Sequence, residues 1–190
     1  ANVEQISRII EIAGSDPAGW RKTTLEERHK IMYEAANRLG EMRGDLIGCM
    51  CAITGKTVVE GDVEVSEGID YARFYTTSMK LFADLPDVDI TPEGTVLVIS
   101  PWNFPCAIPI GGIVAALAGG NTVILKPATV AAPVAWLFAQ AFWDAGVPKE
   151  ALQVIITDRD ALKVLTSAPA IKHIILTGGT DTAQNIACSN

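Results

Sequence analysis

The sequence predicts an α/β protein in which N-terminal amphipathic helices are followed by a Rossmann-like, doubly wound parallel sheet. Three observations support this fold class. Apolar residues recur at helical spacing before Pro92, short β-branched apolar segments follow it, and helical segments separate those apolar segments. We therefore expect residues 1–91 to form a helical segment and residues 92–190 to form a series of βα units.

Two helices are expected in the N-terminal part. Between Thr24 and Gly55 an apolar residue recurs every three or four positions, as on one face of a single long helix. These positions are Ile31, Ala35, Leu39, Met42, Leu46, Met50 and Ile53. Thr24 and Glu27 have the spacing of a capping box, and Gly55 is suited to end the helix. A second helix is expected over residues 57–82, followed by a loop over residues 84–92.

Four later segments are expected as strands because they are short, β-branched and apolar at consecutive positions. They cover residues 95–100, 122–126, 152–157 and 173–177. Continuous apolarity is typical of parallel strands that are covered on both faces. Helices are expected between them over residues 108–118, 133–145 and 158–167. This alternation of strands and helices is that of a parallel sheet with crossover connections.

Composition excludes several classes of protein. The chain has 190 residues, 15 basic against 22 acidic side chains, a net charge of −7 and 49% hydrophobic residues. A disordered chain lacks that much apolar surface, and a nucleic-acid binder would carry the opposite charge. The most apolar stretch, residues 108–118, is short and contains Pro109, so we expect no membrane span. The N-terminus has no apolar leader segment, and the four cysteines fit free thiols, so a cytoplasmic location is expected.

Ligands of such sheets bind at the carboxyl ends of the strands, so four segments there are candidate sites. They are residues 100–105, 126–130, 157–160 and 177–180. In the first, two prolines stiffen a turn that presents Asn103, whose amide could donate to a developing oxyanion. A proline-locked turn with purely packed aromatics is the alternative.

Two further strand ends could bind a nucleotide. Lys126 ends a buried strand, where its ammonium could hold ribose hydroxyls or a phosphate, or extend to the sheet rim as a structural lysine. Gly178 and Gly179 precede a helix, where backbone amides could approach a phosphate or simply form a tight turn. The sequence contains neither the six-residue glycine fingerprint nor a Walker loop. The two histidines, His29 and His173, support no catalytic triad or metal site.

Taken together, these strand ends resemble the aldehyde dehydrogenase superfamily. The matching runs are ISPWNFP at residues 99–105, GNTVILKPA at 120–128 and LTGGT at 176–180. Residues 20–28 and 69–75 also resemble the N-terminal helices of that superfamily. The run around Gly55 and Lys56, with residues 69–75, looks most like the pyrroline-carboxylate dehydrogenases of proline catabolism, which oxidise L-glutamate γ-semialdehyde. Whether the parent carries a fused proline dehydrogenase domain stays open.

The resemblance implies an NAD-binding part of an aldehyde dehydrogenase, with Asn103 as the oxyanion-hole amide. It implies that Trp102 lies beside the nicotinamide, Lys126 binds the adenosine ribose, and Gly178 and Gly179 approach the pyrophosphate. Further cofactor contacts are expected from Ile99, Ser100, Pro101, Ala128 and Thr129. Two positions depart from the family: Gly179 stands where serine is usual, and Thr129 where many NAD-preferring members have glutamate. NADP is therefore not excluded.

The resemblance also implies that the catalytic cysteine and the glutamate base lie beyond the position of Asn190. The chain alone is then expected to be inactive, as the cofactor-domain fragment of an enzyme that takes a small aldehyde and forms homo-oligomers. Three alternatives stay open: an aldehyde dehydrogenase with another substrate, a non-catalytic nucleotide-binding module, and an interaction scaffold built on the N-terminal helices.

Overall fold

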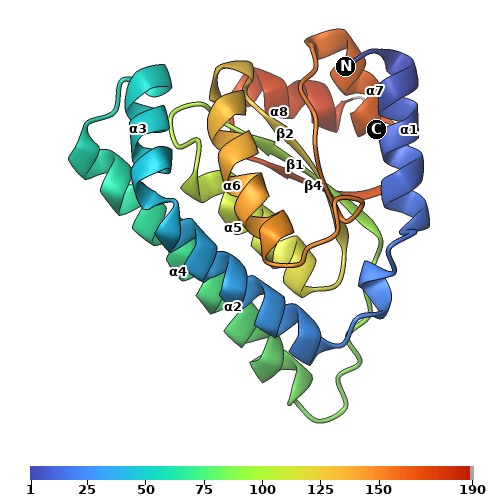
Figure 1. Ribbon diagram of the computed structural model, residues 1–190. Helices are drawn as coiled ribbons and strands as arrows, with labels where there is room; N and C mark the ends of the chain where they lie inside the picture. Colours follow the sequence, from blue (N-terminus) through green and yellow to red (C-terminus); the bar gives the residue numbers. More distant parts are fainter. Residues whose placement is uncertain (189–190) are drawn as a thin grey trace.

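The fold is that of a computed structural model, which describes residues 1–188 apart from the side chains of Arg159 and Asp160. The expected C-terminal end of the βα series at Asn190 lies outside the described residues. Four helices and a short 3-10 turn come first, and a parallel sheet with interleaved helices follows (Figure 1). This order confirms the predicted fold class.

The N-terminal region forms α1 (Val3–Ser15), α2 (Leu25–Glu41), α3 (Arg43–Thr54) and α4 (Val58–Ala83), with a 3-10 turn over Trp20–Lys22. No helix was expected over α1. The expected capping box closes the start of α2, where Glu27 N–H donates to the Thr24 hydroxyl. Gly55 ends α3 with φ +71°, a conformation that glycine adopts without strain.

The single long helix expected between Thr24 and Gly55 is wrong, because the chain breaks it at Met42. The backbone there has φ −87° and ψ 7°, outside the α-helical region, and a new helix starts at Arg43. Gly40 and Gly44 flank the break. Glycine costs a helix about 1 kcal/mol relative to alanine, so helical continuity is weak at this point.

The sheet contains β1 (Thr95–Ser100), β2 (Thr122–Pro127), β3 (Leu152–Val154) and β4 (Ile171–Leu176). All pairs are parallel, in the order β3-β2-β1-β4. The connecting helices are α5 (Ala107–Ala118), α6 (Ala132–Asp144) and α7 (Arg159–Thr166), and α8 (Thr180–Ala187) follows β4. A 3-10 turn over Thr129–Ala131 links β2 to α6.

Helices cover both faces of the sheet, as the continuous apolarity of the strands predicts (Figure 1). Val96 and Val98 of β1 face a large core that they share with α2 to α6. Leu97 and Ile99, one position on in each case, face a smaller core formed with α1, α7 and α8. Residues on both sides of Pro92 therefore contribute to one larger core.

Helices do not fully cover the two faces of β4. His173 and Ile175 are exposed on this strand, and α8 has no buried residue among those described. In the described chain β4 is an edge strand, with β1 as its neighbour on one side only. The apolar side chains of β4 thus indicate strand structure correctly, but they do not indicate how well each face is covered.

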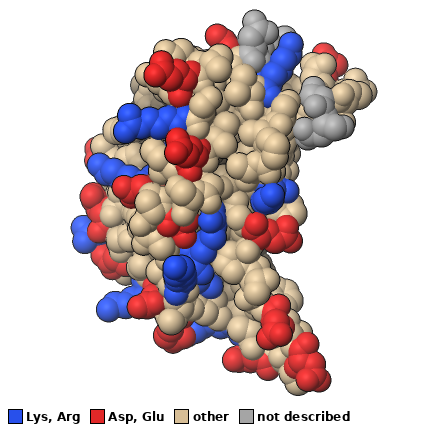
Figure 2. All heavy atoms as spheres, turned by 90° about the vertical axis from the view of Figure 1, so that its right-hand side faces the viewer, with Lys and Arg blue, Asp and Glu red and all other residues tan. Residues whose placement is uncertain are grey.

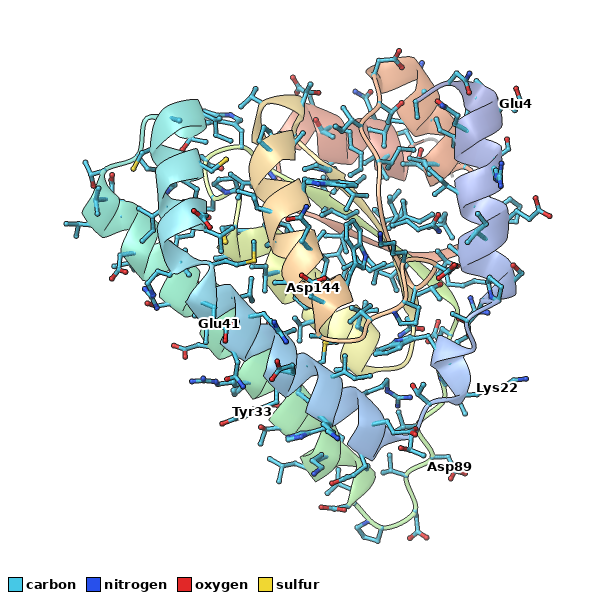
Figure 3. All side chains as sticks on the ribbon, viewed as in Figure 1. Glu4, Lys22, Tyr33, Glu41, Asp89 and Asp144 are labelled. Carbon is cyan, nitrogen blue, oxygen red and sulfur yellow. The ribbon has the colours of Figure 1, made fainter. Side chains whose placement is uncertain are left out.

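Charged side chains lie on the outside of this arrangement. Glu4, Lys22 and Asp89 are exposed on α1, on the turn before α2 and on the loop after α4 (Figure 3). On the face shown in Figure 2, basic side chains are interspersed with acidic ones and form no continuous stripe. Among the described residues, no helix combines the length and the apolar character that crossing a bilayer requires.

Candidate functional site

The carboxyl edge of the sheet brings the three motif turns together. Ser100 pairs in register with Pro127, and Ile99 with Leu176. The link continues past the strands, because Ala128 N–H donates to the Ser100 carbonyl at 3.1 Å. On the other side, Thr177 N–H donates to the Ile99 carbonyl at 3.0 Å. Turns that are far apart in the sequence are therefore hydrogen-bonded neighbours at one edge.

The turn after β1 presents its aromatic residues and one amide to solvent. Trp102 is 56% exposed and Phe104 is 44% exposed, with the exposed Asn103 between them. Pro105 is buried and leads into α5. Among the described residues, none hydrogen-bonds the Asn103 side chain, so its amide is free to donate to a ligand.

The N-terminus of α5 lies just behind this turn and is occupied by a side chain from another helix. Glu64 of α4 accepts hydrogen bonds from Cys106 N–H at 2.7 Å and from Ala107 N–H at 3.1 Å. The whole residue is 2% exposed. Glu64 was not predicted from the sequence, although an acid beside Val65 on the buried face of a helix signals a specific partner. Because these amides are taken, α5 offers no free anion site.

Lys126 is half-buried near the end of β2, on the same side of the strand as Ile124 and hence on the α1 and α7 side of the sheet. Burial lowers the pKa of its ammonium group. Among the side chains that the structure describes, no carboxylate forms an ion pair with it. A partly desolvated cation without a counterion favours a ligand that brings oxygen acceptors.

The glycines before α8 leave space at its N-terminus. Gly179 is the N-cap with φ −73°, an ordinary value for any residue. A Cβ built there would meet no heavy atom within 4 Å, and one at Gly178 would meet only a Leu176 methyl group at 3.6 Å. Neither glycine is therefore required by local packing, and no side chain caps this helix.

The remaining predicted site residues differ in their exposure. Thr129 is exposed, and Pro101 and Ala128 are partly exposed. Ile99 and Ser100 are each 5% exposed, and the Ser100 hydroxyl has no hydrogen-bond partner in the described chain. The Thr157 hydroxyl, just beyond β3, is likewise buried and without a partner. Asp158 next to it caps α7 by accepting from Ala161 N–H at 2.9 Å, which is a structural role.

Neither Cys106 nor the two histidines lie in an arrangement suited to catalysis. Cys106 is fully buried, and burial raises the pKa of its thiol, which opposes formation of a thiolate. His173 lies 2.6 Å from Glu93 at the other end of the sheet, and His29 stacks on Tyr33 of α2. The described residues contain no group of three or more potential metal ligands.

Known proteins share both the sequence pattern and the fold of this chain. Residues 1–189 match the model of the aldehyde dehydrogenase family. The chain is 32% identical over 197 residues to 1-pyrroline-5-carboxylate dehydrogenase of Geobacillus sp. (strain WCH70), covering 98% of this chain and 38% of that protein. It is 33% identical over 165 residues to alpha-ketoglutaric semialdehyde dehydrogenase of Bacillus subtilis (strain 168), covering 82% of this chain and 34% of that protein.

A solved structure agrees with these relatives. Proline utilization A (PutA) from Corynebacterium freiburgense superposes with a TM-score of 0.90 at 36% sequence identity, covering 100% of this chain and 19% of that one. The chain thus spans well under half the length of the proteins it matches. The match runs through the helices, the sheet and all three motif turns, and on this basis the chain belongs to the aldehyde dehydrogenase family.

Proposed function

We propose that this chain is the nucleotide-binding part of an NAD-dependent aldehyde dehydrogenase. The observation that carries the proposal is the meeting of three motif turns at one sheet edge, where the half-buried Lys126 has no carboxylate partner among the described side chains. The open N-terminus of α8 lies at the same edge, after β4. Together these features suit a ligand that has ribose hydroxyls and a pyrophosphate.

The residues divide between binding and chemistry. Lys126 donates to the adenosine ribose, and the amides at Gly178 and Gly179 approach the pyrophosphate. Trp102 lies beside the nicotinamide, which supplies a hydride acceptor when bound. The Asn103 amide donates to the oxyanion that forms when a nucleophile attacks the aldehyde carbon. Further contacts come from the remaining motif residues, Ile99, Ser100, Pro101, Ala128 and Thr129.

The nucleophile of this reaction is a thiolate, and Cys106 does not fit that role because its thiol is buried and its pKa is raised. Cys49 and Cys51 lie on α3, and Cys188 follows α8, outside the turn that presents Asn103. We therefore expect the 190-residue chain alone to form no NADH from an aldehyde. Turnover by the purified chain would contradict this assignment.

For the substrate we propose an aldehyde that carries a carboxylate, specifically L-glutamate γ-semialdehyde. Two relatives support the class: one is named for 1-pyrroline-5-carboxylate and the other for alpha-ketoglutaric semialdehyde. These two relatives are nearly equally similar to the chain, at 32% and 33% identity. The class of carboxylate-bearing aldehydes therefore has more support than L-glutamate γ-semialdehyde in particular. NADH formation by the whole protein with each semialdehyde distinguishes the two.

Calorimetric titration with NAD tests the nucleotide site. We expect the wild-type chain to bind and Lys126→Met to bind about tenfold or more weakly, because hydrogen bonds from a charged donor contribute about 1.5–3 kcal/mol. Lys22→Met, at an exposed lysine near the start of the chain (Figure 3), is the matched control and should bind like wild type. A folded wild-type chain that binds no NAD would overturn the proposal.

The choice between NAD and NADP depends on Thr129, which is exposed directly after β2. A carboxylate beside the adenosine ribose accepts from the 2′-hydroxyl and repels a 2′-phosphate. We expect Thr129→Glu to weaken NADP binding more than NAD binding in the same titration. Equal effects on both nucleotides would place the ribose away from residue 129.

A further inference from the structure

Lys56 connects the turn before α4 with the turn that carries Asn103. Its ammonium nitrogen lies 4.2 Å from the centroid of the Phe104 ring. The same nitrogen lies 3.1 Å from a carboxylate oxygen of Glu64. The Lys56 side chain is only 13% exposed and that of Glu64 is 1% exposed. This cation therefore makes both contacts in a largely water-excluded position.

Glu64 extends the connection to α5. Its other carboxylate oxygen accepts from the amides of Cys106 and Ala107, which follow the turn directly. The turn is thus held at two points: Lys56 holds Phe104 through its ring, and Glu64 holds the backbone beyond Pro105. Asn103 and Trp102 lie immediately before the first of these points.

The strength of this arrangement follows from its burial. A buried carboxylate that loses its cation is strongly destabilised, and a cation over an aromatic ring gains more when water is excluded. In one position, Lys56 contacts both the Glu64 carboxylate and the Phe104 ring. If Phe104 moved away, its contact with the ammonium group would be lost. The Asn103 side chain has no hydrogen bond of its own among the described residues, so its placement depends on the backbone of the turn that carries it.

We propose that Lys56 and Glu64 are positioning residues, which hold residues 102–104 and thereby aim the Asn103 amide. The catalytic consequence rests on the proposed role of Asn103 in oxyanion stabilisation. The ordering of the turn is a property of the chain itself and can be measured without nucleotide or aldehyde.

Hydrogen–deuterium exchange and backbone NMR relaxation of the free chain test this ordering. In Lys56→Met we expect the amides of residues 106 and 107, which donate to Glu64, to exchange about tenfold faster, while β1 and β2 keep their protection. The backbone order parameters should fall at residues 102–104. Lys56→Arg keeps a cation that can stack on the ring and pair with Glu64, so it should restore most of the protection. Lys22→Met is the control for removal of a lysine charge and should leave the turn unchanged.

A second variant keeps the test decisive if Lys56→Met fails to fold. Phe104→Leu removes the ring and leaves the Lys56–Glu64 ion pair, so the backbone order parameters should fall at residues 102–104, while exchange stays unchanged at 106 and 107. Unchanged order parameters at residues 102–104 in a folded Phe104→Leu chain would overturn the proposal, as would an equal rise of exchange throughout the chain in Lys56→Met. A chain that shows the local rise but binds no NAD would remove the proposed function and leave this inference in place.

Discussion

Gly179 stands at the N-cap of α8, where the resemblance to the aldehyde dehydrogenases leads us to expect serine. The position has an ordinary φ of −73°, and a Cβ placed on it would have nothing within 4 Å. A serine there would supply the capping hydroxyl that α8 lacks. At the scale of single residues, this glycine therefore leaves α8 without a side-chain cap, and under the proposed function it also leaves one hydrogen bond to the phosphate unmade.

The first prediction follows from this position. Gly179→Ser should leave the fold intact, change stability by only a few tenths of a kcal/mol in the favourable direction, and tighten NAD binding by several fold. Titration calorimetry and thermal unfolding measure the two effects. Gly19→Ser is the contrasting variant, since that glycine has φ +74° and a side chain there is strained. Weaker NAD binding by Gly179→Ser would place the pyrophosphate elsewhere.

The second prediction concerns the pH dependence of stability. Burial lowers the pKa of Lys126 below its ordinary value of 10.5, so the folded chain binds this proton less tightly than the unfolded chain. At pH values below the lowered pKa the lysine is protonated in both states, and the cost of burying its charge is fully present. The cost disappears as the pH rises through the lowered pKa towards 10.5, where both states become neutral.

Lys126→Met removes this cost. We expect the variant to unfold at a higher temperature than wild type near neutral pH, with a difference that narrows as the pH approaches 10.5. Thermal unfolding over that pH range measures it, with Lys22→Met as the control for net charge. A variant that is less stable than wild type at neutral pH would mean that Lys126 has a favourable partner in the folded chain.

Single residues also show where sequence reasoning stops. The placement of Asn103 and Lys126 at one edge of the sheet was predictable because each lies in a short motif at the end of an apolar strand, and their roles stay predictions. The pairing of Lys56 and Glu64 with Phe104 and the start of α5 was not predictable, because Glu64 and Cys106 are 42 residues apart in the sequence. Only folding α4 against α5 brings these groups within hydrogen-bond distance.

At the scale of secondary structure elements, α1 has a larger structural role than its place before the main helices suggests. It covers the smaller core through Ile6 and Ala13, both fully buried against Leu97 and Ile124 of the sheet. Its Ile9 carbonyl also accepts from the Gln153 side chain in β3 at 3.0 Å. Neither this helix nor its partner in the sheet was predicted from the sequence.

The third prediction tests this packing. Ile6→Ala should lower the free energy of unfolding by about 2–5 kcal/mol, because the side chain is fully buried and leaves a cavity. Val3→Ala on the same helix is the control: Val3 is 57% exposed, and the change should stay within about 0.5 kcal/mol. Urea unfolding measures both. Equal, small effects would show that α1 is not held against the sheet in solution.

At the scale of the whole molecule, the burial of side chains decreases from the central strands towards the edge formed by β4. β1 is completely buried and has strand neighbours on both sides, whereas β4 has exposed residues and α8 has no buried one among those described. The strand segments and their alternation with helices were predictable from local sequence. The uneven burial of the strands was not predictable, because it depends on which strands and helices are neighbours in the fold.

The fourth prediction follows from this gradient. Amides of β1 and β2 should exchange with solvent only through global unfolding, whereas those of β4 and α8 should exchange through local opening, about a hundredfold faster or more. Exchange measured by mass spectrometry on the wild-type chain provides the comparison, with the buried α5 as an internal reference. Equal protection of β1 and β4 would contradict the gradient.

The contact between α1 and the far end of the sheet also sets an order of events during synthesis. Ile9 and Gln153 are 144 residues apart, and ribosomes add about 5–20 residues per second, so α1 waits about 7–30 s for this partner. Leu97 and Ile124 are synthesised sooner, so the core around Ile6 and Ala13 can close before this last contact forms. The helix α1 is therefore buried in stages, first on the two central strands and only later on β3.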